Sequence, residues 1–327
     1  MKNLGARTVW QMTDDDLLGI IYDDHLGSGL KRVNFYAPSF MYYRSSYYSS
    51  STADFPTVSV TAGKCALKCE HCGGRVLETM YPATTPAKLF ELCKRLKLRG
   101  ALGCLISGGC LPDGSVPLAG FVDAIGKIKR ELSLTVVVHT GIIDFPTAQA
   151  LAENGVDTAL IDVIGSDATI REICKMNTTV RDYALSLEAL NNAGINFVPH
   201  VIAGLHHGQL KGELQALEMI SRTKPSALVI IAFMPVRGTL MEGVRPPRPV
   251  DIARVIVTAR TMFPDTPLVL GCMRPKGMHR KETDVLAIRA GVDAIAFPAE
   301  EAIEFAKNQG HKVSFSSLCC SQVYSDA

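Results

Sequence analysis

The chain has 327 residues, 47% of them hydrophobic and 20% charged, with a formal net charge of +2. This composition supports a large core and excludes intrinsic disorder, and the length fits one large domain or two ordinary ones. Because the charge is nearly balanced and no polybasic run occurs, we expect no nucleic-acid and no membrane partner. No apolar run approaches the roughly 18 residues of a membrane span, and the acidic start is no signal peptide, so we expect a cytoplasmic protein.

The first 57 residues differ from the rest of the chain. A short helix is predicted over residues 13–22, with Thr13 as its N-cap and three aspartates in the first turn, where they favour the helix dipole. Residues 35–52 are rich in aromatic side chains and serine and have little helical period. We therefore expect residues 1–57 to form a helix and an irregular arm.

From residue 58 onward, short apolar runs alternate with longer helical patterns, several of which end in Asn-Gly or Ala-Gly. Strands that alternate with helices indicate βαβ units and a parallel sheet. The pattern predicts a (βα)8 TIM-type barrel over residues 58–310, with a doubly wound open sheet as the alternative. We expect residues 311–327 to form a tail over the barrel mouth. The eight predicted strands cover residues 58–61, 104–107, 134–139, 158–163, 196–203, 227–233, 267–270 and 293–297.

Ten cysteines are many for a cytoplasmic chain, in which thiols stay mostly reduced. Their clustering favours metal ligation over disulfides. Directly after the first predicted barrel strand, Cys65, Cys69 and Cys72 form a C-x3-C-x2-C motif. Three thiolates can hold three corners of a four-iron cluster and leave the fourth iron open, whereas a structural zinc site is closed by four ligands.

This motif, in this position, resembles the radical S-adenosylmethionine (SAM) superfamily. The resemblance implies a four-iron, four-sulfur (4Fe–4S) cluster whose open iron binds SAM. One electron then cleaves SAM to methionine and a 5′-deoxyadenosyl radical, which abstracts a hydrogen atom. The aromatic residue that usually precedes the third cysteine is His71 here. A zinc site is the alternative interpretation of the three cysteines.

Three other strand ends are similar to motifs of the same family, and by resemblance they are expected to bind SAM. Ser107, Gly108 and Gly109 match the Gly-Gly motif that holds the SAM amino group. The segment that ends in Gly204 is similar to the piece near adenine. The turn of Pro235, Arg237 and Gly238 resembles the P-x-x-G-T turn of biotin-synthase-like members. A glycine at a strand end is more often a simple turn, so each motif alone is weak.

Polar side chains recur at the predicted strand ends, among them His139, Asp162 and His200. Asp162 lies in an apolar run, where an unpaired carboxylate is unfavourable. We expect these three residues to bind SAM or substrate, although each could instead be a hydrogen-bonded core residue. Arg237 and Arg274 are expected to anchor anionic parts of ligands. No residue is assigned a direct catalytic role.

A second group of cysteines suggests an auxiliary 4Fe–4S cluster. Cys110 follows the Gly-Gly motif, Cys272 follows the seventh strand, and Cys319 and Cys320 lie in the tail. If the tail covers the mouth, these four can meet there; ordinary packing with a loose tail is the alternative. Cys93, Cys104 and Cys174 are expected to pack as small apolar residues.

Radical SAM enzymes that insert sulfur carry an auxiliary cluster as the sulfur donor, as biotin and lipoyl synthases do. From about residue 33 onward the chain resembles archaeal-type biotin synthase homologues, some of which work as two-component lipoyl synthases. Residues 44–47 (RSSY) match a lipoyl synthase motif whose serine caps the auxiliary cluster, although that motif is C-terminal there. The C-x4-C-x5-C motif of single-chain lipoyl synthases is absent.

The resemblance implies sulfur insertion into a protein-bound octanoyl chain, as a lipoyl synthase component. The expected partners are a paralogous radical SAM chain, an octanoylated lipoyl-carrier protein and an electron donor such as ferredoxin. One alternative is a biotin-synthase-like mutase or lyase on a small amino acid, which needs one cluster. Another is a non-catalytic iron–sulfur or metal accessory protein, which needs no SAM pocket.

Overall fold

The computed structural model describes residues 5–23, 32–51 and 53–325. Within these residues, one curled sheet runs in the order β11-β1-β10-β9-β8-β7-β6-β5-β4-β2-β3, and every pair of neighbours is parallel. The edge strands β11 and β3 do not pair with each other, so the curled sheet is open. The strands are β1 (Arg32–Tyr36), β2 (Thr57–Ser59), β3 (Tyr81–Pro82), β4 (Gly103–Ser107), β5 (Thr135–His139), β6 (Thr158–Asp162), β7 (Phe197–Ala203), β8 (Leu228–Ala232), β9 (Leu268–Leu270), β10 (Ala294–Ala296) and β11 (Lys312–Ser316).

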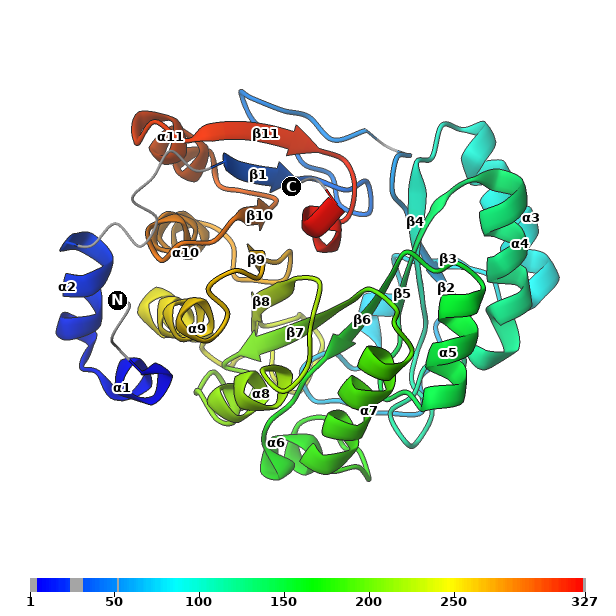
Figure 1. The fold of residues 1–327 in the computed structure, drawn as a ribbon, viewed down its shortest axis with the longest axis horizontal. Helices are drawn as coiled ribbons and strands as arrows, with labels where there is room; N and C mark the ends of the chain where they lie inside the picture. The colour runs from blue at the N-terminus through cyan, green and yellow to red at the C-terminus, as the bar shows by residue number, and fades with distance from the viewer. Residues whose placement is uncertain (1–4, 24–31, 52, 326–327) are drawn as a thin grey trace.

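Helices cover the convex side of this sheet, as Figure 1 shows. Several of these helices begin at an N-cap residue. The Thr85 hydroxyl accepts a hydrogen bond from the Lys88 amide where the helix that begins at Pro86 starts. The Asp144 carboxylate accepts a hydrogen bond from the Thr147 amide where the helix that begins at Phe145 starts. The helices are α1 (Ala6–Gln11), α2 (Asp14–Asp23), α3 (Pro86–Leu98), α4 (Val122–Leu132), α5 (Phe145–Glu153), α6 (Asp167–Glu172), α7 (Val180–Asn192), α8 (Glu213–Ile220), α9 (Pro249–Met262), α10 (Met278–Arg289) and α11 (Glu300–Asn308). None of the described helices is long and apolar enough to cross a membrane.

Both faces of the sheet are buried, which explains why its strands are nearly continuous apolar runs. Successive side chains of a strand point to opposite faces. Accordingly Val136 and Val138 of β5 pack in the large core under the helices, while Val137 between them packs in a second core inside the curve. Leu160 of β6 and Val198 of β7 belong to the same inner core.

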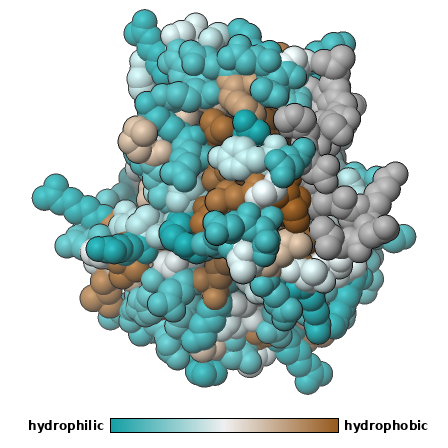
Figure 2. Space-filling model, turned by 90° about the vertical axis from the view of Figure 1, so that its left-hand side faces the viewer, coloured by the Kyte–Doolittle hydropathy of each residue, from teal (hydrophilic) through white to brown (hydrophobic). Residues whose placement is uncertain are grey.

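The N-terminal helices pack outside the ring of barrel helices. The predicted cap of α2 is confirmed, since the Thr13 hydroxyl accepts a hydrogen bond from the Asp16 amide at 3.2 Å. Arg254 of α9 donates to the Met12 carbonyl and the Asp14 carboxylate, which fixes α1 and α2 on α9. Figure 2 shows this face, where apolar side chains are visible at the centre between hydrophilic ones.

All eight predicted strands are present, but the sheet has three more and is not a closed eight-stranded barrel. The predicted N-terminal arm contributes β1, which pairs between β10 and β11. The predicted boundaries at residues 57 and 310 stay predictions, although β1 and β11 from beyond them join the same sheet. Parts of the predicted arm and tail, residues 1–4, 24–31, 52 and 326–327, lie outside the described residues.

The tail lies inside the curve of the sheet rather than across its mouth. After β11, a 3-10 helix, η3 (Cys320–Ser325), contacts β1, β6, β9 and β10 (Figure 1). The Tyr324 hydroxyl donates to the Asp157 carbonyl at 2.9 Å, at the amino end of β6. The side chains of Cys319, Cys320 and Val323 are buried in the inner core. The tail therefore fills the space that an open sheet would leave empty.

Candidate active site at the carboxyl ends of the strands

The first part of the site is the cysteine loop, residues 64–74, which follows β2. Its three thiols, Cys65, Cys69 and Cys72, are half-buried and free. The thiol of Cys69, the thiol of Cys72 and a ring nitrogen of His71 lie within 4.8 Å of one another. The loop therefore presents the sulfur atoms of Cys69 and Cys72 together at a partly accessible surface, and Cys65 interacts electrostatically with Cys69.

Neighbouring loops fix this conformation by backbone contacts. The Ala66 amide donates to the Cys110 carbonyl at 2.8 Å, and the Glu70 amide donates to the Ile173 carbonyl at 2.8 Å. The Gly109 amide donates to the Thr61 hydroxyl at 2.6 Å. The cysteine loop is thus held in place without help from any bound group.

The thiols interact with further cysteines that sequence reasoning placed elsewhere. A hydrogen bond from Cys110 lowers the pKa of Cys65 to about 6. The thiol of Cys69 donates to the Cys174 carbonyl at 3.1 Å, and the neighbouring Cys174 side chain raises the pKa of Cys69 to about 12. Cys174 was predicted to be a packing residue, and its contact with the loop was missed because it depends on the turn after α6.

The donor set fits an iron–sulfur cluster. Three thiols are the ligands such clusters use, and they lie on one loop with no fourth cysteine in the motif. The Nδ1 atom of His71 is buried and has no hydrogen-bond partner among the described residues, which agrees with a group bound beside it. A single zinc ion would fit Cys69, His71 and Cys72 but would leave Cys65 unused.

Two of the three predicted SAM-binding turns lie against the cysteine loop. Ser107 ends β4, Gly108 and Gly109 follow it, and the Ser107 hydroxyl donates to the His139 carbonyl at 3.2 Å. The turn of Pro235, Arg237 and Gly238 follows β8, and Arg75 donates to the Gly238 carbonyl at 3.4 Å. Their role in binding SAM stays a prediction, which their place beside the loop supports.

The third turn is held by a residue that sequence reasoning missed. The Gly204 amide donates to the Glu213 carboxylate at 2.8 Å, within the protein interior. Burial raises the pKa of Glu213 to about 7. Gly204 has a φ of 73°, and an added Cβ would lie 2.7 Å from the Pro247 ring, so a glycine is required there. The sequence signal was a lone glutamate at the start of a helical pattern, which is unremarkable by itself.

His139 ends β5, Asp162 ends β6, and His200 lies in the middle of the neighbouring β7. These three side chains, here called the histidine–aspartate triad, come together. The Nε2 atom of His139 lies 3.4 Å, and the Nδ1 atom of His200 3.3 Å, from the same Oδ1 atom of Asp162. Each residue follows an inner-core residue of its strand by two positions, so all three side chains point into the curve.

The triad is electrostatically coupled. Burial alone would raise the pKa of Asp162, but the two imidazoles outweigh this effect and hold the pKa well below its ordinary value. Burial alone would lower the pKa of His139, but the Asp162 carboxylate more than offsets this effect and raises the pKa. Burial lowers the pKa of His200. The arrangement therefore favours an ionised aspartate and holds a proton more tightly on His139 than on His200.

The predicted auxiliary cysteines divide into two places. Cys110 lies beside Cys65, as its hydrogen bond shows. Cys272, Cys319 and Cys320, here called the second cysteine set, lie together at the inner core. Burial raises the pKa of Cys272 to about 11, and the neighbouring Cys319 contributes to this shift. A hydrogen bond from Cys320 lowers the pKa of Cys319 to about 7.

One expectation about a side chain near the second set is wrong. Arg274 does not face a ligand, because it is fully buried and donates to both carboxylate oxygens of Asp284 and to the carbonyls of Gly271, Ala296 and Phe297. The Ser45 hydroxyl of the RSSY segment is used within its own turn, where it accepts from the Tyr47 and Tyr48 amides. Arg237 is exposed and stays a predicted anion anchor.

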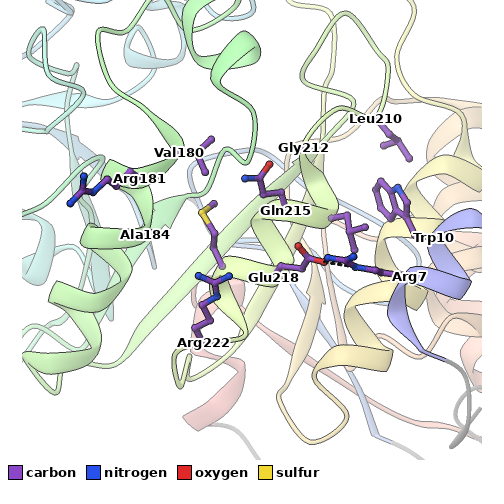
Figure 3. Close-up of a pocket in the computed structure, with 12 residues that line it drawn as sticks. Arg7, Trp10, Val180, Arg181, Ala184, Leu210, Gly212, Gln215, Glu218 and Arg222 are labelled. Carbon is purple, nitrogen blue, oxygen red and sulfur yellow. Dashed lines mark hydrogen bonds and ion pairs between the residues drawn. The ribbon is translucent and has the colours of Figure 1, made fainter.

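A groove lies elsewhere, between α1, α7 and α8 on the outer side of the sheet (Figure 3). Arg7, Trp10, Arg181 and Arg222 line it, and Arg7 forms an ion pair with Glu218 at 2.9 Å. No strand end opens into this groove. The chemistry-bearing residues gather instead at the carboxyl ends of the strands, where parallel α/β folds place their sites.

Comparison with known proteins agrees with this site. Residues 59–217, which contain the cysteine loop and the triad, match the model of the Radical SAM superfamily. The chain is 26% identical over 221 residues to a biotin synthase of Leptospira biflexa, covering 66% of this chain and 62% of the relative, less than two thirds of its length. It is 26% identical over 248 residues to a biotin synthase of Prochlorococcus marinus, covering 73% of each.

Solved structures share the fold. An FeFe-hydrogenase maturase, HydG, has a TM-score of 0.64 and 17% identity, covering 89% of this chain and 63% of its own. A methylornithine synthase has a TM-score of 0.61 and 16% identity, covering 94% and 93%. The cofactors of the superfamily are a 4Fe–4S cluster and SAM, and Cys65, Cys69 and Cys72 are the residues here that fit the cluster.

Proposed function

We propose that this chain, which carries a radical SAM domain over residues 59–217, inserts sulfur into unactivated C–H bonds of a protein-bound octanoyl chain, as one component of a two-chain lipoyl synthase. The observation that carries the proposal is that Cys272, Cys319 and Cys320 all lie at the inner core and interact electrostatically, apart from the cysteine loop. Sulfur insertion needs a sulfur source besides SAM, and a second set of soft thiolate ligands suits an iron–sulfur cluster in that role.

In this proposal the cysteine loop holds the first cluster, which together with SAM supplies the hydrogen-abstracting radical. The backbone of Gly108 and Gly109 lies close enough to the loop to hold the SAM amino group. Gly204 and the turn of Pro235 and Gly238 line the nucleoside. Because these turns are fixed by hydrogen bonds to Thr61, Glu213 and Arg75, the chain positions them before any ligand binds.

In the second cysteine set, Cys319 and Cys320 are buried and Cys272 is half-buried, which would shield a bound cluster from most of the solvent. Two of its members come from the tail, so the position of the tail inside the sheet is what completes the set. The histidine–aspartate triad separates the two sets, since Asp162 lies near Cys110 and His139 near Cys319. A substrate carbon between the two sets would face both.

The similarity to biotin synthases supports sulfur insertion in general, because the chain is 22–27% identical to these enzymes. The octanoyl substrate rests on the resemblance of the sequence to two-component lipoyl synthases. A mutase or lyase that uses one cluster is the second candidate. The P-x-x-G-T turn beside the loop suits a mutase or lyase as well as it suits sulfur insertion.

Iron and sulfide content after anaerobic reconstitution tests the proposal. We expect about eight irons per chain in the wild type, and about four in both the C65A/C69A/C72A and the C319A/C320A variants. Cys93→Ala is the matched control, since Cys93 lies 4.0 Å from Cys104 in the core and away from both sets. About four irons in the wild type, all lost in the loop variant, would contradict a sulfur-donating cluster and favour the mutase or lyase.

Partners can then be tested with the loaded protein. Radical SAM enzymes commonly need an electron donor, and we propose a ferredoxin. We further propose a paralogous radical SAM chain and an octanoylated lipoyl-carrier protein. Incubation of the octanoylated carrier with SAM, reductant and both chains should add sulfur to the carrier, detected by intact mass. If SAM is cleaved and the carrier mass is unchanged, the octanoyl substrate is wrong.

A further inference from the structure

The histidine–aspartate triad offers three metal-binding atoms that the proposed function does not use. Its donor atoms, two imidazole nitrogens and one carboxylate oxygen, lie within 4.8 Å of one another. They come from β5, β6 and β7, which are adjacent in the sheet. Backbone hydrogen bonding between these strands therefore fixes the three side chains relative to one another, before any ion binds.

The distances fit a single ion. The Asp162 Oδ1 atom lies 3.4 Å from the His139 Nε2 atom and 3.3 Å from the His200 Nδ1 atom. Two ligands that are each about 2.1 Å from one metal ion, at an angle of about 105°, are separated by about 3.3 Å. Two of the three donor pairs therefore have the spacing of ligands around one ion, and the two imidazole nitrogens lie within 4.8 Å of each other.

The triad also has the accessibility of a binding site. The side-chain exposures are 25% for His139, 37% for Asp162 and 12% for His200, so an ion can reach the donors from the mouth. A purely structural aspartate between two histidines has no need of that opening. All three donors approach from the sheet, which leaves coordination positions on the opposite side open to a ligand.

The donor chemistry separates this site from the two cysteine sets. Thiolates select iron–sulfur clusters and other soft metals, whereas two imidazoles and a carboxylate select a single first-row divalent ion such as Fe²⁺, Mn²⁺, Co²⁺ or Zn²⁺. We propose that His139, Asp162 and His200 bind one divalent transition-metal ion inside the curve of the sheet, where the ends of β5 and β6 lie beside the middle of β7. This site is independent of the proposed sulfur insertion and would exist whether or not the second cluster does.

Cobalt is a suitable probe, because its absorption spectrum distinguishes nitrogen and oxygen ligands from thiolates. The full chain is reconstituted anaerobically with its iron–sulfur content, freed of excess iron, and titrated with Co²⁺. We expect one cobalt per chain with ligand-field bands and without thiolate charge-transfer bands. Asp162→Ala, His139→Gln and His200→Gln should each weaken cobalt binding by more than about 100-fold, since loss of even outer partners costs 10–100-fold.

His207→Gln is the matched control. His207 lies just beyond β7, in the loop after Gly204, and is exposed. The control should bind cobalt as the wild type does, and the iron content of every variant should be unchanged. If Asp162→Ala does not fold, as judged by circular dichroism, the two histidine variants decide the question. Absence of a non-thiolate cobalt signal in the wild type, or its persistence in the triad variants, would overturn the proposal.

Discussion

The backbones of Gly109 and Lys64 are so close that a Cβ added to Gly109 would lie 2.1 Å from the Lys64 carbonyl oxygen. The same Cβ would lie 2.6 Å from the Cα atom of Cys65. The second glycine of the strand-end motif is thus fixed by contact with the cysteine loop itself. Any side chain at this position must displace backbone that carries the first cluster ligand.

Gly109→Ala should therefore disturb the cysteine loop without disturbing the sheet. We expect it to lower the iron retained by the loop, and to weaken SAM binding by about tenfold or more, because about 1.4 kcal/mol corresponds to tenfold. Gly63→Ala is the control, since a Cβ there meets nothing within 4 Å. Isothermal titration with SAM under anaerobic conditions measures the effect. Equal SAM affinity in both variants would contradict the close approach.

The Arg274–Asp284 pair should contribute to stability rather than to ligand binding. Both side chains are fully buried, and the arginine uses its donors on Asp284 and on three carbonyl groups. Removal of one partner leaves an uncompensated buried charge, so Asp284→Asn should lower the free energy of unfolding by about 3–5 kcal/mol. Glu301→Gln removes an exposed ion pair with Lys281 and should cost less than about 1 kcal/mol. Urea unfolding of both variants measures the difference.

Glu213 should make stability depend on pH. Burial raises its pKa in the folded chain to about 7 from an ordinary value of 4.5. The folded chain therefore holds a proton that the unfolded chain releases above pH 4.5, so this stabilisation is complete below pH 4.5 and is lost as the pH rises through 7. The loss corresponds to about 3 kcal/mol, at about 1.4 kcal/mol for each pKa unit. Glu213→Gln should flatten the change in unfolding midpoint between pH 5 and pH 8, and an unchanged slope would show that Glu213 ionises normally.

The sequence was sufficient to predict the parts of the fold that have a local signal. Each of the eight predicted strands is an apolar run between helical patterns, and each is present. The cysteine motif predicted its own loop because its three ligands lie within a segment of eight residues, Cys65 to Cys72. The strand-end positions of His139 and Asp162 followed from the same pattern, whereas His200 lies in the middle of β7. The mutual contact of the three depends on adjacent strands pairing in register.

The segments at the chain ends could not be predicted in the same way. Strand β1 (Arg32–Tyr36) has no helical pattern beside it, and it forms because β10 and β11 pair with it from 260 and 280 residues away. Strand β11 (Lys312–Ser316) alternates apolar Val313 and Phe315 with polar residues, a signal that was available in the tail. Cys110 was assigned to the second set because it shares a face with Cys272, and only tertiary packing places it beside Cys65.

Val323 should hold the tail inside the sheet. Its side chain is 3% exposed and packs in the inner core with Cys319 and Cys320. Val323→Asp places a carboxylate in apolar surroundings, which is unfavourable enough to displace η3. The two tail cysteines should then react with a thiol reagent in the folded apoprotein many times faster than in the wild type, because burial limits their reactivity.

Ser325→Asp is the control, since Ser325 is exposed, and the reaction is followed by intact mass and peptide mapping. If Val323→Asp leaves Cys319 and Cys320 as unreactive as in the wild type, the tail is held by its remaining contacts, such as those of Tyr324 at the amino end of β6.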